Sequence, residues 1–234
     1  MHHVIWLHSR LLPAQKVRCM KIGLIPAAGL AQRLGIRTPK ELLHFQGQAI
    51  INYNINHLIA AQVDCIVIVI RQGKEAIRHH IAQHYPGFQF DFVYQTGEIG
   101  RLIDAVKASY SAIRNHEVYF CMADTFVTPN PFQFSLQKEL TLFCFEAPGE
   151  EWRHFGVVNL AEGKVVDKPT QYAGNVCWGA LAWQPPFTEK IMAHDDLTAV
   201  MNQADWDYHI CIEQYTDIGI KPEYMPRETK KQTR

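Results

Sequence analysis

The stretch KIGLIPAAGLAQRLGIRTPKELL occupies residues 21–43 and combines the features that decide the fold. Residues 22–25 form a short apolar run, which predicts a buried strand. The small or turn-forming residues 26–29 follow, and they allow backbone N–H groups to approach a bound anion. Arg33 and Lys40 then supply positive charge. A strand, a loop of small residues and these cations together predict a polyphosphate site at the end of the first strand.

The composition of the chain limits the classes of protein to which it can belong. Its 234 residues are 47% hydrophobic, which is enough for a sizeable core in one large α/β domain or two small ones. The 23 basic and 23 acidic residues give no net charge, whereas general nucleic-acid binders normally carry a basic excess. No apolar run approaches the roughly 18–20 residues that span a bilayer. We therefore predict a globular protein with neither a nucleic-acid partner nor a membrane partner.

The cysteines indicate the cellular compartment, and the two ends of the sequence indicate the limits of the domain. None of the 6 cysteines forms a Cys-x-x-Cys or zinc spacing, so we expect a reducing, cytoplasmic setting. Residues 1–19 lack a signal-peptide pattern, and Met20 directly precedes the first strand. We expect residues 1–19 to be an extension that activity does not need, residues 20–226 to form a single domain, and residues 227–234 to be a polar tail.

Strand and helix patterns alternate through the first half of the chain. Apolar runs at 65–70 and 118–124 predict buried parallel strands, and 88–95 alternates as a strand. Helical spacings lie between the strands, at residues 51–59, 74–85 and 104–113. This order predicts an α/β fold of Rossmann-like, three-layer α/β/α type with a mostly parallel central sheet. Ligands of such sheets bind at the carboxyl ends of the strands.

The second half of the chain has a different pattern. Several short strand patterns follow one another with few helices between them, which predicts a smaller, mixed β extension that covers the pocket. We expect helices at residues 187–193 and near 197–214.

Polar residues with catalytic potential stand at strand ends and in later loops. Asp124 ends a buried strand, and Asp217 lies in the segment YTDIGIKPEY; each is either a Mg²⁺ ligand or a turn residue. Lys168 stands between an acid and a proline, where an exposed strand-end lysine is the simpler interpretation. Gln95 ends a strand and carries both a donor and an acceptor, so its side chain could read the edge of a base.

In this order, these features resemble the sugar-phosphate nucleotidylyltransferases, particularly the glucose-1-phosphate thymidylyltransferase type. The resemblance covers about residues 20–225. The matching motifs are Ala28, Gly29 and Arg33 in the loop, Pro39-Lys40, Gln95 with Gly100, Asp104-Ala105, Asp124, Phe155-Gly156-Val157, Asp167-Lys168-Pro169, Trp178-Gly179 and Asp217-Ile218-Gly219. The loop departs from the family pattern Gly-x-Gly-Thr-Arg at Ala31 and Gln32.

The resemblance implies a Mg²⁺-dependent enzyme that transfers a nucleoside monophosphate from a nucleoside triphosphate to a sugar 1-phosphate. A nucleotide-sugar and pyrophosphate form, and dTTP or UTP is the favoured donor. The implied roles are catalytic for Arg33, Lys40 and Lys168, nucleotide-binding for Ala28, Gly29, Leu30, Gln95 and Gly100, sugar-binding for Gly156, Asp167 and Gly179, and metal-binding for Asp124 and Asp217. The implied partners are these substrates, and members of the family often form homo-oligomers.

Other interpretations stay open beside this one. Cytidylyltransferases of small phosphorylated alcohols such as phosphocholine share the fold and the Ala-Ala-Gly loop. A non-catalytic relative that binds a nucleotide-sugar is compatible with the altered loop. The presence of Arg33, Lys40, Asp124, Lys168 and Asp217 favours an enzyme.

Overall fold

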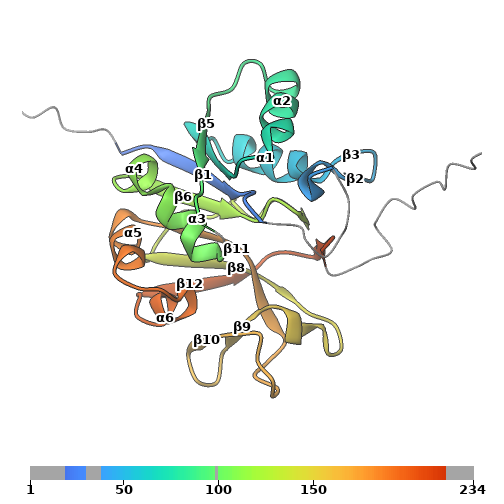
Figure 1. Cartoon of the computed structure of the whole chain (residues 1–234). Coiled ribbons are helices and arrows are strands. Elements are labelled where there is room, and N and C mark those ends of the chain that lie inside the picture. Colours follow the sequence, from blue (N-terminus) through green and yellow to red (C-terminus); the bar gives the residue numbers. More distant parts are fainter. Residues whose placement is uncertain (1–18, 30–37, 98–99, 220–234) are drawn as a thin grey trace, which may run out of the picture.

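A mixed, nine-stranded sheet forms the centre of the computed structural model, which describes residues 19–29, 38–97 and 100–219 (Figure 1). The main path of the sheet runs in the order β10 (Lys164–Asp167), β9 (Gly156–Asn159), β11 (Val176–Trp183), β6 (Glu117–Cys121), β1 (Lys21–Pro26), β4 (Cys65–Ile70) and β5 (Phe90–Tyr94). β8 (Leu140–Glu146) joins this path by pairing with β11, and β12 (Trp206–Ile210) pairs with β8.

The sheet divides into a parallel part and a mixed part, as the sequence predicts. β1 pairs in parallel with β4 and β6, and β4 pairs in parallel with β5. β11 then pairs antiparallel with β6, β8 and β9, and β10 pairs antiparallel with β9. The mostly parallel centre with a mixed β extension is therefore confirmed.

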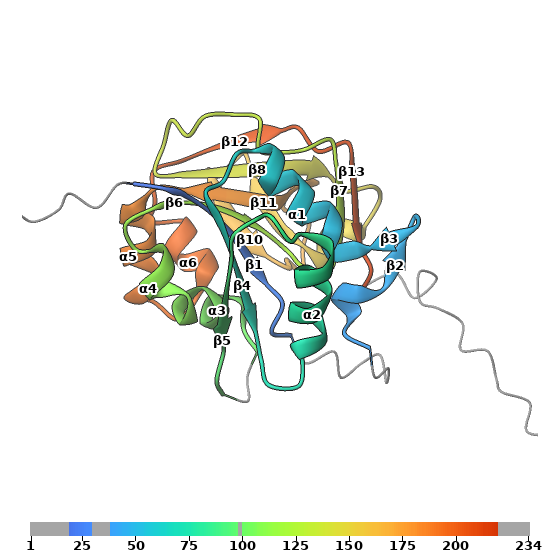
Figure 2. The same ribbon diagram turned by 90° about the horizontal axis from the view of Figure 1, so that it is seen from above.

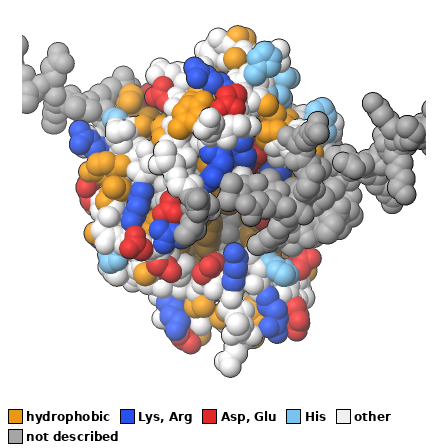
Figure 3. All heavy atoms as spheres, viewed as in Figure 1, with side chains coloured by type: hydrophobic (Ala, Val, Ile, Leu, Met, Phe, Trp, Pro, Cys, Tyr) orange, Lys and Arg blue, Asp and Glu red, His pale blue; other side chains and the backbone are white. Residues whose placement is uncertain are grey.

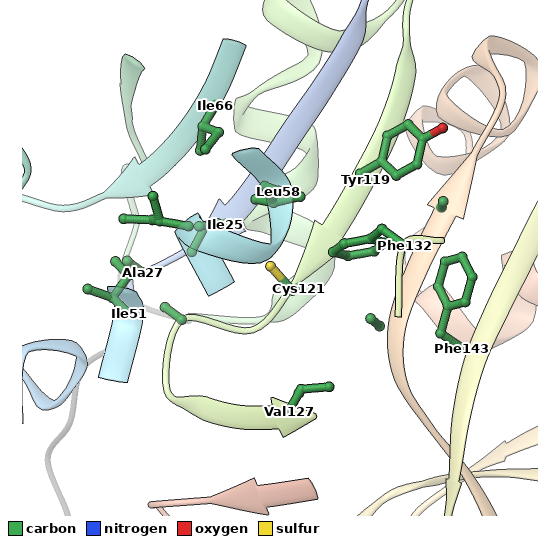
Figure 4. Packing of buried hydrophobic residues seen from close by; sticks show 14 of the residues in the cluster. Ile25, Ala27, Ile51, Leu58, Ile66, Tyr119, Cys121, Val127, Phe132 and Phe143 are labelled. Carbon is green, nitrogen blue, oxygen red and sulfur yellow. The ribbon is translucent and has the colours of Figure 1, made fainter. Parts of the chain in front are cut away.

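Helices cover both faces of the sheet, which completes the expected three layers (Figure 2). One face carries α1 (Ile50–Ala60) and α2 (Glu75–His84), and the other carries α3 (Leu102–Ala108), α4 (Tyr110–Ile113), α5 (Pro185–Met192) and α6 (Leu197–Met201). Branched aliphatic side chains fill the space between the layers, and Ile51 and Leu58 of α1 gather near Ile25 and Ile66 of the sheet (Figure 4). Their burial at 0% exposure makes this packing a main source of stability.

A short hairpin and a separate two-stranded ribbon flank the sheet. The hairpin joins β2 (His44–Phe45) to β3 (Gln48–Ala49), and its turn residues Gln46 and Gly47 have φ values of 45° and 95°. Positive φ at both positions is what a type I′ turn requires. The ribbon pairs β7 (Thr125–Thr128) with β13 (Gln214–Asp217) in antiparallel register. Short 3₁₀ helices η1 (Lys40–Leu42) and η2 (Glu151–His154) complete the elements.

Two helix boundaries differ from the sequence-based expectation. The helix expected near 197–214 is wrong beyond Met201, because residues 206–210 alternate as the edge strand β12 and residues 214–217 form β13. The single helix expected at 104–113 is interrupted at Ser109, whose hydroxyl donates to the Val106 carbonyl at 2.7 Å. Such local side-chain bonds compete with helical continuity.

Several sequence-based expectations fall on parts of the chain outside the described residues. These are the extension up to residue 18, the loop residues Leu30, Ala31, Gln32 and Arg33, and the tail 227–234. The single domain over residues 20–226 stays a prediction, and it is supported by the sheet, which runs from β5 to β10 without a break. Among the described helices, none combines the length and the apolar character that crossing a membrane would require.

Candidate active site

Lys40 of η1 is in direct contact with Asp124, which follows the carboxyl end of β6. Lys40 begins η1, and its ammonium donates to Asp124 Oδ2 in an ion pair. Asp124 follows β6, and its side chain is only 8% exposed. Burial acts to lower the pKa of Lys40, but the charge and hydrogen bond of Asp124, with smaller effects of Glu41 and Asp217, raise this pKa overall. Lys40 therefore stays a cation beside a buried carboxylate.

Asp217 reaches the same place through the ribbon of β7 and β13. Its position opposite Thr125 in this ribbon puts it beside Asp124 in space, although the two are far apart in the chain. The Gly219 N–H donates to Asp217 Oδ1 at 2.7 Å. A Cβ added at Gly219 would lie 3.0 Å from Asp217 Oδ1, 3.8 Å from Asp124 Oδ2 and 3.9 Å from Lys40 Nζ. Charged groups thus surround a small space that a larger residue at position 219 would fill.

The donor set around Gly219 fits a divalent cation. Carboxylate oxygens are the ligands that Mg²⁺ prefers, and Mg²⁺ commonly takes one or two of them together with waters and substrate phosphates. Within residues 19–29, 38–97 and 100–219, no group of three or more histidine, cysteine, aspartate or glutamate side chains could hold a metal by itself. Asp124 and Asp217 would therefore share a cation with phosphate oxygens and water.

Two cations between β4 and α2, Arg71 and Lys74, donate hydrogen bonds to the loop after β1. Ala27 and Ala28 are buried, and the Ala27 N–H donates to the Val69 carbonyl at 2.7 Å. Arg71 Nε donates to the Ala28 carbonyl, and Lys74 Nζ donates to the Ala27 carbonyl at 2.7 Å. Both carbonyls thus accept a hydrogen bond from a buried or half-buried cation. These bonds hold the backbone of the predicted phosphate loop in a fixed orientation.

A buried ion pair connects this loop to the segment that carries Lys40. Lys74 Nζ donates to Glu41 Oε1 at 2.6 Å, and the residues are 7% and 1% exposed. Burial lowers the pKa of Lys74 and raises the pKa of Glu41, and the opposite charge of the partner counteracts each shift. Since Glu41 directly follows Lys40, this pair ties η1 to the loop after β1.

Gln95 and Gly100 lie at the carboxyl end of the neighbouring strands. Gln95 is 6% exposed, its N–H donates to the Ile70 carbonyl at 2.8 Å, and its side-chain Nε2 is buried with no hydrogen-bond partner in the described part of the chain. A Cβ at Gly100 would lie 3.6 Å from Arg71 Nη2. The predicted nucleotide-binding residues Ala28, Gln95 and Gly100 therefore all lie next to Arg71 or to the strand that it follows.

The predicted sugar-site residues belong to the β extension. Asp167 ends β10, and Lys168 follows it with φ 42° while its N–H donates to the Phe155 carbonyl at 3.0 Å. Both side chains are exposed along an open groove of about 460 Å³. Among the described residues, no hydrogen bond or ion pair joins Lys168 to Lys40 or Asp124.

Gly156 and Gly179 provide room for large neighbours in this extension. A Cβ at Gly156 would lie 2.0 Å from Trp178 Nε1, and a Cβ at Gly179 would lie 2.9 Å from the Tyr215 ring. Gly179 also stands where the register between β11 and β8 shifts. Both glycines thus allow an aromatic ring to pack directly on the backbone.

The view in Figure 3 shows the face on which these elements meet. Basic and acidic side chains of the described residues gather around a hollow near the middle of this face. The mixture of both signs agrees with the zero net charge of the chain.

Comparison with known proteins assigns this arrangement to a family. The model of the MobA-like NTP transferase domain matches residues 23–152. The chain belongs to this family. It is a nucleotidyltransferase, and the matched segment contains the loop after β1, Lys40, Gln95 and Asp124. Lys168 and Asp217 follow the matched segment. No curated protein sequence matches the chain.

Solved structures with the same fold agree with this assignment. A protein described as a glucose-1-phosphate thymidylyltransferase from Bacillus anthracis, in complex with a sucrose, is 15% identical with a TM-score of 0.76, over 85% of this chain and 90% of that one. A UDP-glucose pyrophosphorylase from Acinetobacter baumanii is 16% identical with a TM-score of 0.73, over 88% and 90%. HddC from Yersinia pseudotuberculosis is 17% identical with a TM-score of 0.68, over 88% and 96%.

The resemblance seen in the sequence is therefore confirmed for the family and the fold, while the roles of individual residues stay predictions. Sequence reasoning missed Glu41, Arg71 and Lys74, which the structure places beneath the loop. For Arg71 the sequence did contain one indication. This residue directly follows the apolar run 65–70, so it must stand at the carboxyl end of a parallel strand, where ligands bind.

Proposed function

We propose that this nucleotidyltransferase transfers a nucleoside monophosphate from a nucleoside triphosphate, with dTTP or UTP favoured, to a sugar 1-phosphate. The main observation that supports the proposal is that Lys40, Asp124 and Asp217 lie together around the space beside Gly219. One cation and two carboxylates at the carboxyl end of a parallel sheet suit the binding of a triphosphate with its divalent counterion.

The reaction needs no nucleophile from the protein, because the acceptor phosphate is already an anion. An oxygen of the sugar 1-phosphate attacks the α-phosphorus, the bond from this phosphorus to the bridging oxygen breaks, and pyrophosphate leaves with the bonding electrons. The protein contributes position and charge, as in phosphoryl transfer generally. The N–H groups of the loop after β1, together with Arg33, would hold the phosphates that become pyrophosphate.

Lys40 would change partners when the substrates bind. In the structure its ammonium neutralises Asp124. In the complex this ammonium would instead lie against the α-phosphate, where negative charge develops. Asp124 and Asp217 would hold Mg²⁺, which when bound offsets phosphate charge.

The remaining predicted residues would bind the rest of each substrate. Gln95 and Gly100 would contact the base, with Ala28, Gly29 and Leu30 of the loop beside the nucleotide. Lys168 would bind the sugar phosphate, and Gly156, Asp167 and Gly179 would line the sugar site. We further propose a cytoplasmic enzyme whose single domain spans residues 20–226 and which forms homo-oligomers.

A panel of substrates tests this proposal. Pyrophosphate release is measured for four nucleoside triphosphates against several hexose 1-phosphates, phosphocholine and polyol phosphates, with and without Mg²⁺. Turnover only with the alcohol phosphates would identify a cytidylyltransferase of that type instead. Tight nucleotide-sugar binding without pyrophosphate release would identify a non-catalytic relative.

The variant Asp124→Asn tests the metal site within the same assay. Loss of the carboxylate charge is expected to abolish Mg²⁺-dependent turnover with only a limited loss of thermal stability, because the Lys40 side chain is 22% exposed and its ammonium can turn to solvent when its partner is lost. Asp205→Asn is the matched control, because Asp205 is exposed and, in the described structure, its carboxylate pairs only with Lys138 at the surface. Turnover of Asp124→Asn close to that of the unmodified protein would remove Asp124 from the metal site.

A further inference from the structure

Arg71 presents a buried hydrogen-bond donor that the described part of the chain does not use. Its Nε donates to the Ala28 carbonyl, which fixes the plane of the guanidinium. Its Nη2 is buried and has no hydrogen-bond partner among the described residues. Since a guanidinium can only donate, and a buried donor without a partner is costly, this atom requires an acceptor from elsewhere.

Gln95 presents a second such donor beside it. The parallel register of β4 and β5 pairs Val69 with Val93 and Ile70 with Tyr94, so the next pair along the strands is Arg71 and Gln95. Val69 and Val93 both pack in the core cluster on the α3 side of the sheet. Because side chains alternate along a strand, Arg71 and Gln95 face this same side.

Gly100 leaves the space in front of Arg71 open. A Cβ at this position would lie 3.6 Å from Nη2, so a larger side chain at residue 100 would stand directly against the guanidinium. A single candidate subsite therefore lies at the carboxyl end of β4 and β5. It is lined by the donors of Arg71 and Gln95, by the buried Ala28 and by the backbone of Gly100.

The chemistry of this place suits the edge of a base better than a phosphate. The predicted phosphate site has its own cations, whereas here a neutral amide with a donor and an acceptor stands next to the guanidinium. Uracil and thymine carry two carbonyl oxygens, cytosine and guanine carry one, and adenine carries none and exposes an amino donor instead. We propose that Arg71 is a base-recognition residue that, with Gln95, selects a nucleobase with carbonyl oxygens at its edge. This inference rests on the proposed function, because it assumes a nucleotide substrate.

Binding measurements test the role of Arg71 without requiring turnover. Affinities for UTP, dTTP, CTP, GTP and ATP are measured by titration calorimetry for the unmodified protein, Arg71→Met and Arg78→Met. Arg78 is the matched control, because it is exposed on α2. We expect the unmodified protein to prefer UTP and dTTP over ATP, and Arg71→Met to reduce this preference about tenfold, mainly by weaker UTP binding. Arg78→Met should keep the preference.

Gly100→Val provides a second test should Arg71→Met fail to fold. It leaves the guanidinium and its bond to Ala28 in place and fills the space before Nη2, so UTP binding should again weaken more than ATP binding. An equal loss for all nucleotides with Arg71→Met would show a phosphate contact and overturn the proposal. Unchanged affinities in both variants would also overturn it.

The two proposals fail in different ways. Base-selective binding that depends on Arg71, without pyrophosphate release on any acceptor, would overturn the proposed function and leave the role of Arg71 standing. Pyrophosphate release with a base preference that Arg71→Met does not change would overturn only the role of Arg71. If the unmodified protein binds none of the nucleotides, both are wrong.

Discussion

Replacing Lys74 by methionine would remove one member of the buried ion pair beneath the predicted phosphate loop. The substitution keeps most of the side-chain volume and deletes the charge. It leaves the Glu41 carboxylate, in a residue that is 1% exposed, without the ammonium that lies 2.6 Å from it, and it leaves the Ala27 carbonyl without its donor at 2.7 Å. Breaking a buried pair on one side typically costs about 3–5 kcal/mol. We expect Lys74→Met to lower the free energy of unfolding by about this amount.

Urea unfolding at neutral pH provides the measurement, and the transition midpoint should fall with little change in the slope of free energy against denaturant. The double variant Glu41→Leu/Lys74→Met should regain part of the loss, because apolar replacement of both partners of the pair is often neutral, while the Ala27 carbonyl still lacks its donor. Lys138→Met is the control, since Lys138 pairs with Asp205 at the surface and its loss should cost less than about 1 kcal/mol. A cost below about 1 kcal/mol for Lys74→Met, or a double variant as unstable as the single one, would refute the reasoning.

Further predictions concern the acceptor site, the β extension and the pH dependence of stability. Lys168→Ala should raise KM for the sugar phosphate about tenfold in initial-rate measurements while KM for the triphosphate stays constant, and a defect confined to the triphosphate would contradict the proposed role. Gly156→Ala should lower stability by about 1–3 kcal/mol and shift tryptophan fluorescence, because its Cβ would lie 2.0 Å from Trp178 Nε1; unchanged spectra and stability would contradict this packing. Burial lowers the pKa of His57 below its ordinary value of 6.5, so the unfolded chain takes up the proton first and stability should fall as the pH drops below this value. Urea midpoints at about pH 7.5 and about pH 5.5 should show a smaller fall for His57→Gln than for the exposed His79→Gln, and equal falls would argue against His57.

The parallel half of the fold was predictable because local patterns there agree with the tertiary structure. Residues 65–70 are an unbroken apolar run, and they form a strand that is buried along its whole length. The edge strand β12 was missed because its alternation is short and follows directly on the helical spacing of α6. Such short patterns do not distinguish a strand from the continuation of a helix.

The candidate site was predictable only in part, for a related reason. Lys40, Asp124 and Asp217 stand out through the family motifs, but Asp217 reaches the other two only through the long-range pairing of β7 with β13. Glu41 and Lys74 look like ordinary surface charges in the sequence. Their role follows from burial at 1% and 7% exposure, which no local pattern shows.

The ribbon of β7 and β13 also determines when, during synthesis of the chain, the charged residues of the candidate site come together. A chain that emerges from the ribosome presents Lys40 and Asp124 long before Asp217 exists, and domains begin to fold from their N-terminal parts. The nascent chain can therefore build the parallel sheet and the first charged pair, but the second carboxylate arrives only when β13 pairs with β7. Truncation before residue 214 would leave a chain that retains the segment matched by the family, at residues 23–152, yet lacks Asp217.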